Sequence, residues 1–177
     1  MNEEIIMAGF GGQGIMLMGK LLSYAGMKED KEVSWMPSYG PEMRGGTANC
    51  TVIVSDKKIP SPMSSRPDTI IVMNLPSLDK FLPKVKSGGT VFMNSSLIGK
   101  DVEREDVKVI KVPANKIANE LGNARVANMV MLGSYIEEKD IVKPETVKKS
   151  LESVLSARNQ DLIEMNVKAL ERGKEYK

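Results

Sequence analysis

Histidine is absent from this sequence of 177 residues, and cysteine occurs only once, at Cys50. Without histidine, the common zinc sites and histidine-based acid–base catalysis are excluded. A single thiol cannot form a disulfide within the chain, and it falls short of the roughly four thiolates that hold an iron–sulfur cluster. We therefore expect this chain to bind no metal and to lack redox or acid–base machinery of its own.

The sequence also lacks an apolar run of the roughly 18 residues that a membrane span needs. Its acidic N-terminus leads at once into a short apolar segment, which is unlike a signal peptide. We therefore expect a cytoplasmic protein that does not contact a membrane. The formal net charge is only +2, from 25 basic and 23 acidic residues. Nucleic-acid binding needs clustered positive charge, so nucleic acid is not an expected partner.

What the sequence does contain is a regular alternation of strand and helix patterns. Apolar strands are predicted at 4–8, 33–36, 50–54, 68–74, 90–94 and 107–112, with 57–59 as a hairpin partner of 50–54. Helices are predicted after residue 14 and at 77–85, 113–122, 126–138, from 144 onward and at 158–173. This alternation predicts a single α/β domain over residues 1–177, in which helices cover both faces of a mostly parallel sheet.

A glycine-rich loop follows the first predicted strand. Gly9, Gly11 and Gly14 fit the pattern G-x-G-x-x-G between a strand and a helix, where free backbone N–H groups attract anions. A bound dinucleotide would also need an acidic residue at the end of the second strand, but that strand ends in Pro37-Ser38. The glycines instead serve a different phosphate-bearing ligand, or they allow close packing of strand, helix or partner. The candidate ligand contacts are Gly9, Gly11, Gly12, Gln13 and Gly14.

A second glycine-rich loop joins the second and third predicted strands, at residues 37–50. Loops of this length are usually functional or disordered, and the apolar residues in this one favour docking. The Arg44 guanidinium suits a carboxylate or phosphate, or else an internal ion pair with Glu42. Cys50 enters an apolar run, which favours a buried, inert thiol over a nucleophile. We expect this loop to be an interface, with the candidate contacts Tyr39, Glu42, Met43, Arg44, Gly45, Gly46 and Asn49.

These two loops together resemble a known family. The chain resembles the gamma subunit of 2-oxoacid:ferredoxin oxidoreductases in two segments. They are Gly9-Phe10-Gly11-Gly12-Gln13-Gly14-Ile15 and Pro37-Ser38-Tyr39-Gly40-Pro41-Glu42-Met43-Arg44-Gly45-Gly46-Thr47-Ala48-Asn49-Cys50. The resemblance covers residues 4–155. The sequence of the second segment is more similar to that of the 2-oxoglutarate and branched-chain 2-oxoacid enzymes than to that of the pyruvate enzymes.

The resemblance implies a Rossmann-like three-layer domain, with extra C-terminal helices, that is active only inside a larger complex. Alpha and beta subunits, and in some complexes a ferredoxin-like delta subunit, would hold thiamine diphosphate, magnesium and iron–sulfur clusters. The complex would convert a 2-oxoacid to an acyl-coenzyme A and reduce ferredoxin. Coenzyme A is then the leading ligand for the first loop. The remaining alternatives are a stand-alone nucleotide- or coenzyme-binding enzyme and a regulatory binding module.

Overall fold

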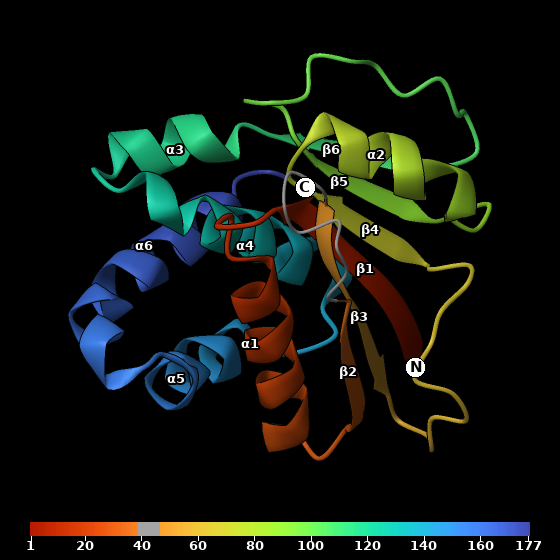
Figure 1. The fold of residues 1–177 in the computed structure, drawn as a ribbon. Helices are drawn as coiled ribbons and strands as arrows, with labels where there is room; N and C mark the ends of the chain where they lie inside the picture. The colour runs from red at the N-terminus through yellow and green to blue at the C-terminus, as the bar shows by residue number, and fades with distance from the viewer. Residues whose placement is uncertain (39–46) are drawn as a thin grey trace.

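The computed structural model describes residues 1–38 and 47–177, and its centre is a six-stranded sheet with the order β2-β3-β1-β4-β5-β6 (Figure 1). The strands are β1 (Asn2–Phe10), β2 (Glu32–Ser38), β3 (Thr47–Ser55), β4 (Thr69–Val72), β5 (Thr90–Asn94) and β6 (Lys108–Val112). Neighbouring pairs are parallel from β1 to β6, whereas β3 is antiparallel to both β1 and β2. Five strands therefore point the same way and only β3 opposes them, which confirms the mostly parallel sheet.

Helices form a layer on each face of this sheet. The helices are α1 (Ile15–Lys28), α2 (Leu75–Phe81), α3 (Ala114–Glu120), α4 (Ala127–Lys139), α5 (Pro144–Val154) and α6 (Ile163–Gly173), with short 3-10 helices at Leu82–Lys84, Ala124–Val126 and Ala157–Leu162. Figure 1 shows α2 on one side of the sheet, and α1 with the C-terminal helices on the other. The three-layer α/β architecture is thus confirmed.

Two apolar cores separate these layers, and β1 contributes to both. Because successive side chains of a strand point to opposite faces, Ile5 and Met7 pack into the larger core beneath α1 and α4, while Ile6 and Ala8 pack beneath α2. The continuous apolar run of β4 is buried along its whole length, as expected for a central parallel strand.

The predicted hairpin at residues 57–59 is wrong. β3 already forms hydrogen-bonded ladders with β1 on one edge and β2 on the other, so it has no free edge for a further strand. Residues 57–64 instead leave the sheet and cross its face. The Ser64 hydroxyl holds this segment in place by donating a hydrogen bond of 2.6 Å to Glu4 Oε2.

Candidate functional site

The first glycine-rich loop lies at the carboxyl edge of the sheet, directly after β1. The chain leaves β1 to form α1 on one face, and it leaves the neighbouring parallel strand β4 to form α2 on the other face (Figure 1). Connections that diverge in this way open a crevice at the strand ends, where α/β proteins bind their ligands. The loop that the sequence singled out is therefore at the position in the fold best suited to a ligand.

The conformation of this loop depends on two glycines and one glutamine. Gly12 and Gly14 have φ angles of 89° and 74°, a region that L side chains rarely adopt. Gln13 closes the turn, because its backbone N–H donates to the Phe10 carbonyl at 3.2 Å and its Oε1 accepts from the Phe10 N–H at 2.6 Å. The Gln13 side-chain oxygen is therefore engaged within the loop.

The glycines of the loop divide into packing positions and open positions. A Cβ on Gly9 would lie 2.8 Å from Ile15 Cδ1 and 2.9 Å from Met73 Cβ, so Gly9 allows the strand, the helix and β4 to pack closely. A Cβ on Gly14 would overlap with the Asn128 amide. A Cβ on Gly12 would meet no described residue within 4 Å. Close packing thus accounts for Gly9 and Gly14, while Gly12 faces open space.

A cavity of about 160 Å³ lies beside Gly12, and the helices α1 and α4 begin next to it. It is lined by Gly12, Gln13, Met73, Asn115, Ala124, Arg125 and Ala127. α1 begins just after Gly14, α4 begins at Ala127, and neither helix carries an acidic residue in its first turn. Arg125 is exposed and is the one charged residue in the lining. Two positive helix ends and a guanidinium therefore favour an anionic group here.

Buried asparagines join the elements around this cavity. Asn94, at the end of β5, donates to Asn115 Oδ1 at 2.7 Å and to the Met73 carbonyl at 3.4 Å. Asn128, at the start of α4, donates to the Gly14 carbonyl at 3.1 Å and accepts from the Met129 N–H at 2.9 Å. Neither asparagine was predicted from the sequence. The sequence feature that could have identified them is a polar residue at the point where an apolar strand or helix begins or ends.

The strand order gives a physical reason for the missing dinucleotide signature. β3 lies between β1 and β2, so β2 is about 10 Å from β1 instead of adjacent to it, given roughly 4.8 Å between neighbouring strands. The strand beside the loop therefore runs in the opposite direction and presents its first residues there, including Asn49 opposite Ala8. An acidic ribose contact from the end of an adjacent second strand has no counterpart in this arrangement.

Cys50 is buried in the core between β3 and α1. Its thiol lies 3.8 Å from the Ile15 carbonyl, and burial raises the pKa of Cys50 to about 12, while a hydrogen bond with Trp35 lowers it by less. The thiol is thus protonated at neutral pH, which confirms the prediction of a buried, inert cysteine. Within residues 1–38 and 47–177, no three His, Cys, Asp or Glu side chains are grouped as a metal site would require. No helix in this part of the chain is long and apolar enough to cross a membrane.

The second predicted site falls largely outside the described residues. Tyr39, Glu42, Met43, Arg44, Gly45 and Gly46 all lie in the undescribed range. Asn49 is described. It pairs with Ala8 of β1 and with Ser38 of β2, and it lines a second cavity, of about 260 Å³, on the sheet face opposite α1.

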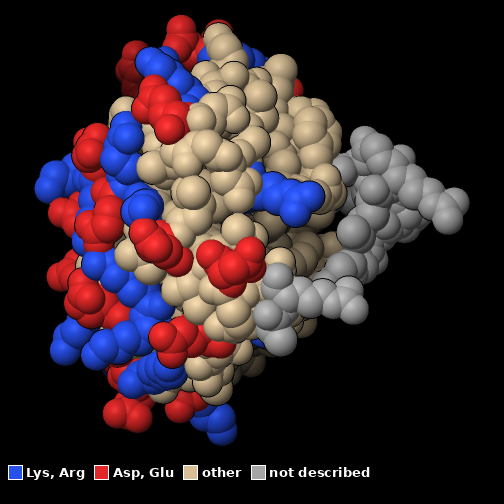
Figure 2. All heavy atoms as spheres, turned by 90° about the vertical axis from the view of Figure 1, so that its left-hand side faces the viewer, with Lys and Arg blue, Asp and Glu red and all other residues tan. Residues whose placement is uncertain are grey.

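The helical side of the molecule carries acidic and basic side chains of both signs, interspersed (Figure 2). Much of the remaining described surface is uncharged in this view. The face shown therefore has no continuous basic patch of the kind that attracts nucleic acid.

The sequence matches the pyruvate ferredoxin/flavodoxin oxidoreductase family over residues 4–176. It is 36% identical over 178 residues to the 2-oxoglutarate synthase subunit KorC of Methanocaldococcus jannaschii, covering 99% of this chain and 94% of that protein. It is 37% identical to the ketoisovalerate oxidoreductase subunit VorA of Methanothermobacter marburgensis, where 98% of this chain spans only 36% of the relative.

Two solved structures are similar along nearly the whole chain. The gamma subunit of a keto/oxoacid ferredoxin oxidoreductase from Geobacter sulfurreducens superposes with a TM-score of 0.87 at 28% identity, covering 99% of this chain and 95% of that one. The 2-oxoglutarate:ferredoxin oxidoreductase of Magnetococcus marinus, solved with 2-oxoglutarate, coenzyme A and succinyl-CoA bound, gives a TM-score of 0.89 at 25% identity. That match covers 98% of this chain and 30% of the longer one.

Proposed function

The chain belongs to the pyruvate ferredoxin/flavodoxin oxidoreductase family, and from this premise we propose that it is the gamma subunit of a 2-oxoacid:ferredoxin oxidoreductase. The substrate of the complex would be 2-oxoglutarate or a branched-chain 2-oxoacid, since the relatives include 2-oxoglutarate synthase and ketoisovalerate oxidoreductase subunits. The match to KorC runs along almost the whole of both chains, whereas in VorA the matching segment is about a third of a longer protein. The same unit therefore occurs both as a separate chain and as part of a longer one.

In this proposal the complex oxidatively decarboxylates the 2-oxoacid, forms an acyl-coenzyme A and reduces ferredoxin in the cytoplasm. Alpha and beta subunits, with a possible ferredoxin-like delta subunit, hold thiamine diphosphate, magnesium and the iron–sulfur clusters. This chain, acting as one domain over residues 1–177, contributes assembly contacts and a surface near coenzyme A. With no histidine and one buried cysteine, it offers few groups for chemistry of its own.

The observation that carries the ligand assignment is the meeting of the α1 and α4 N-termini and Arg125 around one cavity. Backbone N–H groups at helix starts donate to phosphate oxygens, and a guanidinium forms charge-assisted hydrogen bonds with them. Gly12 lets a ligand approach the backbone, because it has no side chain and no described residue fills the space beside it. Coenzyme A carries phosphate groups of this kind, so we assign its phosphate-bearing part to this cavity.

The proposal is tested by purifying the tagged chain from its native extract and identifying the proteins that accompany it. We expect subunits that bind thiamine diphosphate and iron–sulfur clusters. The chain produced alone should be colourless and should not reduce a dye with a 2-oxoacid, because its composition cannot supply a cluster. Absorbance near 400 nm from a cluster in the isolated chain, or 2-oxoacid-dependent dye reduction by it, would overturn the proposal.

The same helix ends also favour a second candidate, a stand-alone nucleotide- or coenzyme-binding module that uses the loop from Gly9 to Gly14. The two proposals differ in what the free chain does. A stand-alone module would bind its coenzyme tightly without other subunits, and no thiamine-dependent subunits would accompany it from the extract. The complex subunit would need its partners for full affinity.

A further inference from the structure

The sheet face opposite α1 is covered unequally along its width. On the α1 side, Val52 and Val54 of β3 are buried in the core, and α1 approaches so closely that a Cβ on Gly19 would lie 2.5 Å from Cys50 Sγ. On the other side, α2 covers β4 and its neighbours, but no helix in the described part of the chain covers β3 and β2 there (Figure 1). Among the described residues, the segment 57–64 is what crosses this face.

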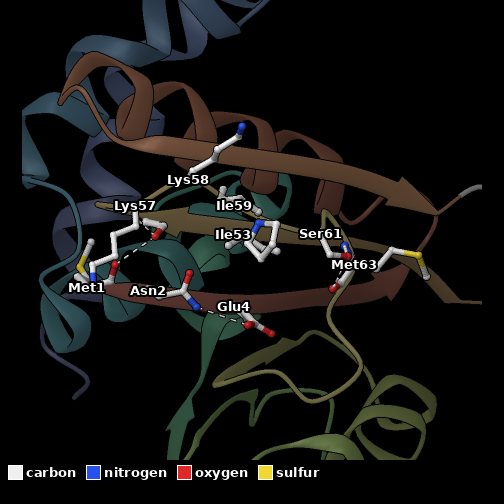
Figure 3. Close-up of a pocket in the computed structure, with 11 residues that line it drawn as sticks. Met1, Asn2, Glu4, Ile53, Lys57, Lys58, Ile59, Ser61 and Met63 are labelled. Carbon is white, nitrogen blue, oxygen red and sulfur yellow. Dashed lines mark hydrogen bonds between the residues drawn. The ribbon is translucent and has the colours of Figure 1, made fainter.

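Two cavities lie on this open face and share the side chain of Met63. The larger, of about 450 Å³, runs along β1, with Met1 and Lys57 at one end and Met63 at the other (Figure 3). The smaller, of about 260 Å³, continues to Ser38 and Asn49, where β2 and β3 adjoin the predicted interface residues 39–46. We call the two cavities together the open-face groove.

The floor of the open-face groove combines apolar side chains with short polar ones. Ile53 and Ile59 supply apolar surface beneath the larger cavity, and Thr51 lines the smaller one. Three methionines remain accessible along the groove: Met63 is 71% exposed, Met1 is 46% exposed and Met36 is 37% exposed. Flexible thioethers of this kind are common on surfaces that adapt to a partner.

The open-face groove carries an excess of unpaired positive charge. Its acidic group is already satisfied, because Glu4 accepts from Ser64 at 2.6 Å and lies 3.8 Å from Lys86 Nζ. The N-terminal amine is paired with Asp56 at 2.7 Å. By contrast, Lys57 and Lys58 make no ion pair with any described residue. The same holds for Lys84 in the smaller cavity, which lies 5.4 Å from the Phe81 ring centroid.

We propose that the open-face groove receives an extended segment of a partner subunit, in which acidic side chains alternate with apolar ones. The accessible apolar side chains of the groove, among them Ile59 and Met63, would contact the apolar side chains of an extended segment, and the unpaired lysines would take its carboxylates. The short side chains of β3 allow a backbone to come close to the sheet. The groove also reaches Ser38, which directly precedes the predicted interface residues 39–46 in the sequence. This inference rests on the proposed function, since it needs the other subunits of the complex.

Methionine oxidation tests the groove without altering the chain. The free chain and the assembled complex are treated briefly with hydrogen peroxide, and oxidation is measured for each methionine by mass spectrometry. We expect oxidation of Met63 and Met36 to slow at least fivefold on assembly. Met27, which is 61% exposed on α1, is the internal control and should change little. Unchanged oxidation of Met63 in an assembled complex overturns the groove proposal and leaves the proposed function standing.

Charge reversal gives a second, independent measurement. The double variant Lys57→Glu/Lys58→Glu should weaken binding of the partner subunits at least tenfold, and the loss should shrink at high salt. Lys143→Glu/Lys149→Glu is the matched control, because both lysines are exposed and make no ion pair with a described residue. If the two double variants weaken binding of the partner subunits equally, the groove proposal is wrong. If Met63 is protected in the isolated chain in a concentration-dependent way, a second copy occupies the groove and the proposal is wrong. Failure of the unaltered chain to assemble at all defeats both proposals.

Discussion

The side-chain amide of Asn128 donates a hydrogen bond of 3.1 Å to the carbonyl of Gly14, across 114 residues of sequence. This contact joins the start of α4 to the start of α1, the two helices that begin at the candidate ligand cavity. It requires glycine at position 14 for two reasons. The φ angle there is 74°, and a Cβ would overlap with the Asn128 amide.

Gly14→Ala should therefore destabilise the chain more than a positive φ angle alone explains. We expect the conformational cost to be about 1–2 kcal/mol, and displacement of Asn128 to add about 1–3 kcal/mol. Gly88→Ala is the control, because Gly88 has a φ of 79° but open space around its Cβ position. Urea unfolding of both variants measures the difference. Equal losses would show that the Asn128 contact adjusts without cost.

Much of the fold follows from local patterns in the sequence. The run Thr69-Ile70-Ile71-Val72 reads as a buried parallel strand and is one, because its pattern needs no distant information. Pro144 begins α5 as predicted, since proline suits the first turn of a helix. The incorrect hairpin at 57–59 depended instead on which strands pair with one another. Both edges of β3 are occupied, by β1 and by β2, and local sequence does not show this.

The candidate site was predictable only in part, for the same reason. The glycine spacing identifies the loop after β1, but it cannot show that Gly14 packs against a side chain 114 residues away. Arg125 lies in a short 3-10 helix between α3 and α4, without a motif of its own. The carboxyl edge of the sheet brings these elements together, so they become a site only once the strand order is known.

Arg125→Ala should weaken the use of coenzyme A by the assembled complex. Loss of one charge-assisted hydrogen bond is worth about 1.5–3 kcal/mol, which corresponds to roughly 10–100-fold in the apparent KM for coenzyme A. Decarboxylation itself should be spared, because in the proposed complex the thiamine-binding subunits would carry it. Lys116→Ala is the control, since Lys116 is an exposed cation of α3 outside the cavity lining. An unchanged KM in a folded, assembled Arg125→Ala complex would contradict the assignment.

We expect no useful binding of NAD or NADP by the free chain. β3 separates β1 from β2, so the loop can offer phosphate contacts but lacks the adjacent acidic ribose partner. Calorimetric titration should give no transition in the micromolar range for either nucleotide. Low-micromolar affinity would mean that the ribose is held by residues other than those of the second strand.

Cys50 should make the stability of the chain fall at high pH. The folded thiol keeps its proton up to a pKa of about 12, whereas the unfolded thiol titrates near 9.0. The stabilisation is therefore complete below pH 9 and is lost between pH 9 and 12, by about 2 kcal/mol at pH 10.5, since each pKa unit is worth about 1.4 kcal/mol. Urea unfolding at pH 7, 9 and 10.5 measures this loss. Cys50→Ala should have a flatter pH dependence at alkaline pH, and equal slopes for the two chains would refute the assignment.

Arg44 lies outside the described residues, and the sequence places it in the predicted interface loop. A guanidinium clamped by a partner carboxylate is costly to remove, because truncation leaves the other charge buried without a partner, at about 2–5 kcal/mol. Arg44→Ala should therefore weaken assembly by roughly tenfold or more, since about 1.4 kcal/mol is a factor of ten. Thermal unfolding of the isolated chain should hardly change. Lys149→Ala, on the exposed side of α5, serves as the control for loss of a surface charge. The opposite pattern, a destabilised free chain with normal assembly, would identify Arg44 as half of an internal ion pair.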